Sequence, residues 1–252
     1  MRKLESNIVV DNEPFQDIVR YENESIYNTM ILNCNVGSPI FFGCTLKEMV
    51  FDTCDLNNAR FFSDCTIEEC KFNHCDLRSI GIEENKAVFT DCEFIGCDMR
   101  GMTLENATFI RCQFKKCKLN NRILKEARIV DCCFVGKLID ITFEGEGKQK
   151  WIVNFEECIL DDVHFINCNL IACIPPKFKD HLYVDDLSVR IKSALTIANK
   201  NFDLSVDERK RLVRSLNKLQ NNQQYIFNIT NMKKNYGDMF TEVFLNSLGL
   251  EQ

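Results

Sequence analysis

Residues 87–121 read, in blocks of five, AVFTD, CEFIG, CDMRG, MTLEN, ATFIR, CQFKK and CKLNN. A large apolar residue occupies the third place of each block, and the same phase continues through Leu124 and Ile129 to Phe134. The first place is usually Cys or Ala. A period of five matches neither the 3.6-residue repeat of a helix nor the two-residue alternation of a strand. A short fixed repeat of this kind predicts a solenoid.

This motif resembles the pattern of the pentapeptide-repeat family, in which a small residue, a polar residue and a Leu or Phe precede two variable positions. The resemblance covers roughly residues 29 to 175. It implies a mainly β fold, a right-handed quadrilateral β-helix with four pentapeptides in each square coil. We therefore expect an N-terminal cap at 1–28, the β-helix at 29–175 and an α-helical C-terminal extension at 176–252.

We call the large apolar residue at the third place of each repeat its centre. The centres can be assigned to four faces although the phase of the repeat slips twice, near Ser63 and Asp64 and again near Asn85 and Lys86. One face then collects Ile31, Phe51, Phe72, Phe94, Phe114 and Phe134, and the next collects Val36, Leu56, Leu77, Met99 and Leu119. Because the columns survive both slips, we expect the extra residues to form small bulges at corners. Pro175 and Pro176 end the repeat, since proline cannot donate to a ladder.

Fifteen cysteines would normally suggest a disulfide scaffold. Here fourteen of them precede a centre by two residues, and only Cys133 is out of phase. A free thiol in that place acts as a small buried apolar group, so we expect packing and a reduced native state. Zinc is the alternative, but the chain has no CxxC pair and its three histidines are scattered. We expect no metal and no cofactor.

The net charge and the lengths of the apolar runs limit the partners and the cellular location that we expect for the protein. A net charge of −6 argues against direct binding of nucleic acid through its phosphates. The sequence has no run of 18 apolar residues, which argues against a membrane partner. The N-terminal residues MRKLESNIVVDNEP contain no apolar stretch of signal-peptide length. We expect a cytoplasmic protein.

The C-terminal extension carries helix signals. Leu187, Ile191 and Leu195 have helical spacing, and Ser205-Val206-Asp207-Glu208 is a capping box. A last helix presents apolar residues that are candidates for docking on the solenoid or for dimerisation: Met239, Phe240, Val243, Phe244 and Leu248. Docking would use the flank where Ile110, Val130 and Ile171 form an outward column. Family members often dimerise through this end, so the resemblance leaves a homodimer open.

Two places are candidate partner-binding sites. Phe42 and Phe62 fall at equivalent outward points of successive coils and form an apolar patch, unless the N-terminal segment covers it. The stretch EGEGKQK after Phe143 is longer than two repeats allow and predicts a projecting loop. Loops on rigid scaffolds often carry function, and gyrase-binding family members also use them. The candidate residues in this loop are Gly145, Glu146, Lys148 and Lys150.

The sequence contains no GxSxG, P-loop or HExxH motif, so we expect no enzymatic activity. We expect a non-catalytic scaffold that binds a protein. The alternative that the resemblance implies is a DNA mimic that binds DNA gyrase or topoisomerase IV, giving quinolone protection or toxin self-immunity. Mimicry would require about three negative charges per coil of about 4.8 Å. Residues 29–175 hold 22 acidic and 16 basic side chains, a net charge of −6 over about seven coils.

Overall fold

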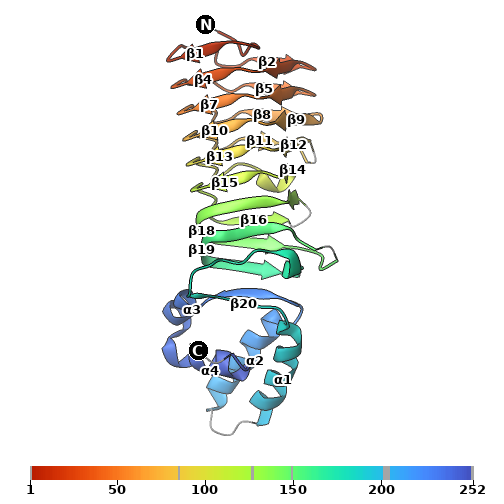
Figure 1. Ribbon diagram of the computed structural model, residues 1–252, viewed down its shortest axis with the longest axis vertical. Coiled ribbons are helices and arrows are strands. Elements are labelled where there is room, and N and C mark those ends of the chain that lie inside the picture. The colour runs from red at the N-terminus through yellow and green to blue at the C-terminus, as the bar shows by residue number, and fades with distance from the viewer. Residues whose placement is uncertain (1, 85, 126–127, 149, 201–204, 251–252) are drawn as a thin grey trace.

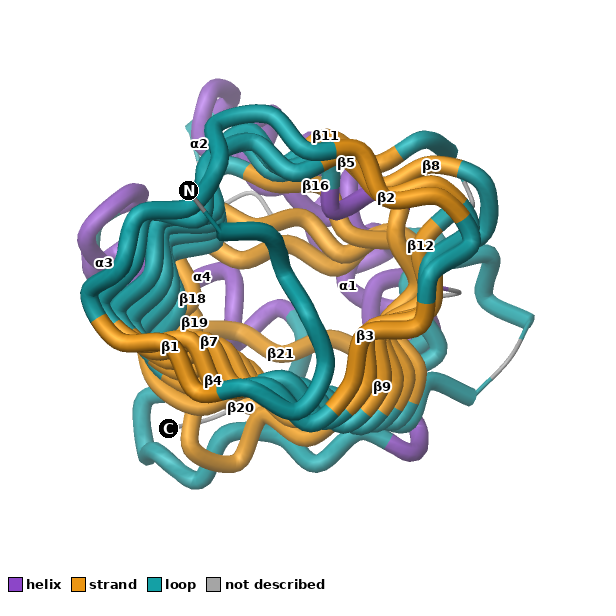
Figure 2. Tube along the Cα trace, turned by 90° about the horizontal axis from the view of Figure 1, so that it is seen from above, coloured by secondary structure: helices purple, strands orange, loops and turns teal. Residues whose placement is uncertain are grey.

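The protein is a long rod of stacked coils that ends in a helical module (Figure 1). The computed structural model describes residues 2–84, 86–125, 128–148, 150–200 and 205–250. It is a mainly β, right-handed solenoid of about seven turns with a few C-terminal helices, as the sequence predicted. Viewed along the rod, the strands of each face superpose and the corners align (Figure 2). None of the described helices is long and apolar enough to span a membrane.

The first face is a parallel ladder of one short strand from each coil. Its strands are, in spatial order, β1 (Val9–Asp11), β4 (Met30–Leu32), β7 (Val50–Asp52), β10 (Lys71–Asn73), β13 (Glu93–Ile95), β15 (Gln113–Lys115) and the start of β18 (Cys132–Glu144). The predicted column is confirmed: Ile31, Phe51, Phe72, Phe94, Phe114 and Phe134 pair in this order. Adjacent Phe rings stack with centroids 5.0–5.3 Å apart.

On the second face, isolated bridges stack the coils in the order Asn35, Asp55, Asp76, Asp98 and Lys118. The residues that follow these five form the predicted second column: Val36, Leu56, Leu77, Met99 and Leu119. All members of this column are buried. Both predicted columns are therefore present in the register that the repeat indicated.

The third and fourth faces complete the square. The third face comprises β2 (Arg20–Glu22), β5 (Ile40–Phe42), β8 (Arg60–Phe62) and β11 (Gly81–Ile82), followed along the chain by the 3-10 turn η1 (Leu104–Asn106) and β16 (Arg122–Lys125). The fourth face comprises β3 (Ser25–Tyr27), β6 (Thr45–Lys47), β9 (Cys65–Glu68), β12 (Ala87–Thr90), β14 (Ala107–Ile110) and β17 (Ile129–Val130). Four inward side chains per coil fill the interior, each contributing about 1.5 to 3 kcal/mol.

Left-handed residues turn the chain at the corners. Many corner residues have a φ of 51° to 67°, and they are mostly Asn, Asp and Gly, the residues that tolerate this conformation best. Gly96 shows why one corner needs glycine, because its φ is +62° and an added Cβ would lie 2.8 Å from the His74 ring. The slip at Ser63 and Asp64 is such a corner, since both residues have positive φ just after β8. Asn85 lies outside the described residues, but the register of β9 with β12 is regular after it.

The ladders begin earlier than the predicted boundary at residue 29. Strands β1, β2 and β3 already pair in parallel with the next coil. Val10, Tyr21 and Ile26 take inward, buried positions in this first coil. Leu4 is buried against its open end, and the Leu4 N–H donates to the Tyr21 hydroxyl at 2.7 Å. The segment 1–28 therefore contains a coil as well as the residues that cover it.

The last coils depart from the regular pattern. β18 and β19 (Val153–Ile166) have 13 and 14 residues and run through corners as continuous parallel strands. The large inward residues of the final coil are all buried: Phe155, Leu160, Phe165 and Leu170. A short turn, η3 (Leu170–Ala172), follows them. An isolated bridge from Asn154 to Ile174 is the last rung before the two prolines.

Within the described residues, the C-terminal extension is a module of four helices and one strand pair. The helices are α1 (Leu187–Lys200), α2 (Val206–Leu219), α3 (Ile229–Tyr236) and α4 (Asp238–Ser247). The predicted capping box is present at the start of α2, where Ser205 and Glu208 bond reciprocally. The antiparallel pair β20 (His181–Val184) with β21 (Tyr225–Asn228) was not predicted.

The module covers the end of the last coil and not the flank, which was one of the two alternatives left open for the last helix. Val130 and Ile171 remain exposed. Four of the bonds that join the two parts run between module side chains and coil backbone: Leu160 N–H to His181 Nε2 (3.0 Å), Asn228 Nδ2 to Leu160 O (2.6 Å), Asn167 N–H to Asn222 Oδ1 (2.9 Å) and Leu170 N–H to Gln224 Oε1 (3.1 Å). The physical reason is that the last coil leaves polar backbone groups that need partners.

Phe94→Ala tests whether the interior column stabilises the rod. Phe94 is buried between Phe72 and Phe114, with ring centroids 5.0 and 5.1 Å away. We expect the substitution to lower the free energy of unfolding by about 3 to 5 kcal/mol, because it removes buried area and leaves a cavity. Urea denaturation measures the change. Lys71→Ala, on the exposed side of the same face, is the control, and an equal loss in both variants would contradict the packing argument.

Candidate interaction surfaces

Phe42 and Phe62 form a stacked aromatic pair on the outside of the third face. They are paired in register between β5 and β8, and their rings stack with centroids 5.0 Å apart. Both side chains are partly exposed. The guanidinium of Arg20 lies over the Phe42 ring at 4.0 Å, in cation–π contact, and Arg20 also pairs with Glu22. The N-terminal coil therefore covers one end of the pair, and Arg20 joins it as a residue that the sequence analysis missed.

The predicted loop after β18 projects sideways from the rod (Figure 1). Gly145 is held to the scaffold by a bond from its N–H to Ile166 O (2.9 Å). Glu146 and Lys148 form an ion pair at 3.0 Å, and both side chains are 80% exposed. Lys150 is exposed too. These four residues share one projecting loop whose charges face solvent.

The residues predicted for docking or dimerisation, in α4 and at its C-cap, differ in how deeply they are buried. Phe244 and Leu248 are buried, and Phe244 contacts the Phe227 ring of β21 with centroids 5.9 Å apart. Phe240 and Val243 are half-buried against the core. Met239 is 71% exposed. Most of this apolar stripe therefore builds the core of the module itself.

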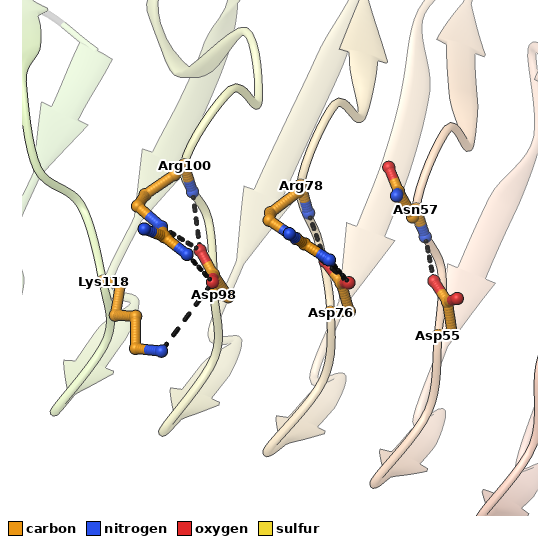
Figure 3. Close-up of polar contacts among 7 residues, drawn as sticks. All are labelled: Asp55, Asn57, Asp76, Arg78, Asp98, Arg100 and Lys118. Carbon is orange, nitrogen blue, oxygen red and sulfur yellow. Dashed lines mark hydrogen bonds and ion pairs between the residues drawn. The ribbon is translucent and has the colours of Figure 1, made fainter.

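A ladder of aspartates runs along the second face (Figure 3). Asp55, Asp76 and Asp98 occupy one position in successive coils. Each carboxylate accepts the backbone N–H two residues later, an Asx turn, at 2.8, 3.0 and 3.3 Å respectively. The residues two places later differ, since Asn57 follows Asp55 while Arg78 and Arg100 follow the other two. The recurrence of Asp-x-Arg 22 residues apart is a signal that the sequence analysis did not use.

The arginines neutralise this ladder. Arg78 Nη2 and Arg100 Nη2 each lie 2.6 Å from the carboxylate of their own turn, and Lys118 Nζ lies 3.8 Å from Asp98. The hydrogen bond from Arg78 lowers the pKa of Asp76, and the bond from Arg100 lowers the pKa of Asp98. Both carboxylates are thus charged and paired. The column presents alternating charge to solvent rather than a continuous negative stripe.

Comparison with known families identifies the repeat. Residues 85–121 match the family model for pentapeptide repeats, in eight copies. The chain carries pentapeptide repeats. A comparison with curated protein sequences gave no match.

Two solved structures of pentapeptide-repeat proteins are similar to this chain. Full-length QnrB1, described as a plasmid-mediated fluoroquinolone resistance protein, is 14% identical, with 68% of this chain and 85% of that chain covered and a TM-score of 0.45. HetL, a pentapeptide repeat protein involved in heterocyst differentiation regulation in the cyanobacterium Nostoc sp. strain PCC 7120, is 10% identical, with 69% and 92% covered and a TM-score of 0.31. At these identities and TM-scores, neither protein's role transfers to this chain.

The cysteines of the pentapeptide repeats pack as small interior groups. The described residues include all fifteen cysteines; none of them forms a disulfide bond, and thirteen are buried. Ten of their S–H groups point at carbonyl oxygens of the preceding coil, as from Cys97 to Phe72 O at 3.1 Å and from Cys117 to Phe94 O at 3.3 Å. Burial raises the pKa of Cys158, and raises that of Cys173 to about 12. These two thiols therefore stay protonated and unreactive.

The three histidines lie apart. His164 is half-exposed beside Asp162, and His181 is a buried cap whose Nδ1 bonds Asp180 at 2.9 Å while Nε2 accepts from Leu160. Among the described residues, no group of three or more His, Cys, Asp or Glu side chains is arranged to hold a metal ion.

Asp98→Asn tests the charge pairing of the ladder through its pH dependence. The ordinary pKa of the Asp98 carboxyl is 3.8 and the folded value is lower. Its contribution to stability is therefore present above that value and is lost as the pH falls through the folded pKa. We expect the variant to be less stable by about 0.5 kcal/mol at pH 6, with the difference vanishing near pH 2 to 3. Thermal unfolding at several pH values measures this.

Asp55→Asn is the matched control, because Asp55 makes the same Asx turn but Asn57 stands in place of the arginine. The amide oxygen of an introduced Asn can still accept the turn bond in both variants. We expect Asp55→Asn to leave the free energy of unfolding almost unchanged at every pH. A pH-independent loss of equal size in the two variants would refute the ion-pair account.

Proposed function

We propose that this protein is a non-catalytic scaffold that binds a protein partner through the third face of its rod. The observation that carries the proposal is the Phe42–Phe62 stack with Arg20 over one ring. Aromatic residues and arginine dominate the energetics of protein interfaces. The ladder backbone holds both rings in place before binding, so that little side-chain entropy is lost on association.

The loop at 145–150 is a second proposed contact. Gly145, Glu146, Lys148 and Lys150 project from a rigid coil, and the exposed Glu146–Lys148 pair offers both signs of charge to a partner. Exposed ion pairs contribute little to stability, so the sequence of this loop is free to serve recognition. A homodimer through α4 stays a prediction; of the five residues proposed for it, Met239 alone is highly exposed.

The alternative, a DNA mimic that binds a type II topoisomerase, receives no support from the charge distribution. A duplex presents about one negative charge per 1.7 Å of its axis. The regular acidic column described above contains Asp55, Asp76 and Asp98, and two of the three are paired with arginine. The net charge of the rod is therefore low where mimicry would require it to be high.

Replacing the two rings by aspartate tests the scaffold. We expect Phe42→Asp and Phe62→Asp to weaken capture of the partner from a lysate of the source cells by at least tenfold, because each places a charge in the centre of the apolar contact. Quantitative mass spectrometry of captured proteins measures the loss. Val9→Asp, at a 70% exposed apolar residue of β1 on the first face, is the control. A partner set that is the same for all three variants would overturn the proposed surface.

A supercoiling assay separates the scaffold from the alternative. We expect micromolar protein to leave DNA gyrase and topoisomerase IV activity unchanged, with or without ciprofloxacin, because the rod lacks the charge density of a duplex. Agarose gels of relaxed and supercoiled plasmid report the result. Relief of ciprofloxacin inhibition, or direct inhibition of supercoiling, would favour the DNA mimic instead.

A further inference from the structure

A pocket of about 480 Å³ lies where the last coil meets the C-terminal module. One wall is the end of β19, and the others come from the end of α2, from β21 and from α3 and α4. Pockets that hold small groups in proteins have volumes of about 300 to 1,000 Å³, are mostly apolar and carry a few placed polar groups. This pocket has the volume of such a site, whereas the faces of the rod are flat.

The apolar part of the pocket is an aromatic floor. Tyr225, Phe227, Phe240 and Phe244 line it together with Met232. The rings are held by one another, with centroid distances of 4.7 Å for Tyr225–Phe227, 5.9 Å for Phe227–Phe244 and 6.2 Å for Phe240–Phe244. An aromatic guest would therefore meet rings that are already in position, in the edge-to-face or offset geometry that such pairs prefer.

The polar part is a group of asparagine amides. Asn222 and Asn228 use theirs to attach the module to the last coil, and the Asn231 Nδ2 donates to Asp161 at 2.8 Å. Asn221 and Asn235 line the same pocket and are exposed. A carboxamide both donates and accepts, so it matches the N–H and C=O of a peptide bond.

The charges around the pocket balance. The lining contains one carboxylate, Asp162, and one ammonium group, Lys218, and His164 contacts that carboxylate at 3.5 Å. The formal charges of Asp162 and Lys218 sum to zero. An ionised ligand would lose its hydration without an opposite net charge to replace it. The pocket therefore favours a neutral guest.

We propose that this pocket binds a peptide segment of a partner protein by one aromatic side chain, with the flanking peptide bonds on Asn221 and Asn235. The aromatic floor takes the ring, the amides take the backbone, and the balanced charge suits an uncharged segment. The volume admits one residue with its flanking amides and excludes a folded domain. The proposal rests on the scaffold function and gives it a further, separate site with a stated partner chemistry.

The test uses N-acetyl-phenylalanine amide, which carries one ring and two amides, with the full chain. We expect saturable one-to-one binding by calorimetry or NMR shift changes, and at least tenfold weaker binding of N-acetyl-glycine amide. Asn235→Ala should weaken binding several-fold, because it removes one amide partner. Ser215→Trp, which fills the pocket from α2, should abolish it. Asn217→Ala is the matched control on α2, outside the pocket lining, and should bind like the unchanged protein.

Each remaining outcome counts against the proposal. No saturable binding up to the solubility limit of the probe, or equal binding by Asn217→Ala and Ser215→Trp with both folded by circular dichroism, would overturn it. Binding of adenosine without binding of the peptide amide would show a nucleoside pocket instead. Should Ser215→Trp fail to fold, Lys218→Trp at the exposed rim provides the second filled variant. Phe42→Asp leaves this pocket intact, so failure here and failure of the third-face surface are distinguishable.

Discussion

The structure depends on the vertical stacking of inward side chains from one coil to the next. Each inward residue lies on its equivalent in the coil above, as the Phe column from Phe51 to Phe134 shows. This stacking requires that every coil returns to the same register. The corners make this possible, because left-handed residues such as Asn33 and Thr53 turn the chain at equivalent points. The interior is therefore apolar and repetitive.

The same register also stacks the outward residues of successive coils in columns. Phe42 meets Phe62, and Asp76 meets Asp98, for the same geometric reason that the buried rings meet. A single outer residue has little effect, whereas a column becomes a surface. Whether such a column can bind a partner depends on the charged residues beside it. The arginines two residues after Asp76 and Asp98 make that column electrically balanced, while Arg20 extends the aromatic one.

How much the sequence predicts depends on whether a feature repeats. The Phe and Val36–Leu119 columns were predictable because their period persists through two insertions. The first coil was not, because Val10, Tyr21 and Ile26 carry the inward pattern without the Cys and Phe that mark it elsewhere. Single contacts carry no periodic signal at all. The bond from Leu160 to His181 and the pairing of β20 with β21 depend on residues that occur once, so only three-dimensional structure reveals them.

The end of the rod explains why the concave site lies where it does. A solenoid can extend its ladders indefinitely, so its last coil must be closed by something with a different fold. Here amides of Asn222, Gln224 and Asn228 supply the missing partners of the coil backbone. Closure by side chains rather than by another flat coil leaves the two parts imperfectly matched in shape. The 480 Å³ pocket lies in that mismatch, among the same kind of amides, and this is why we place a further recognition site there.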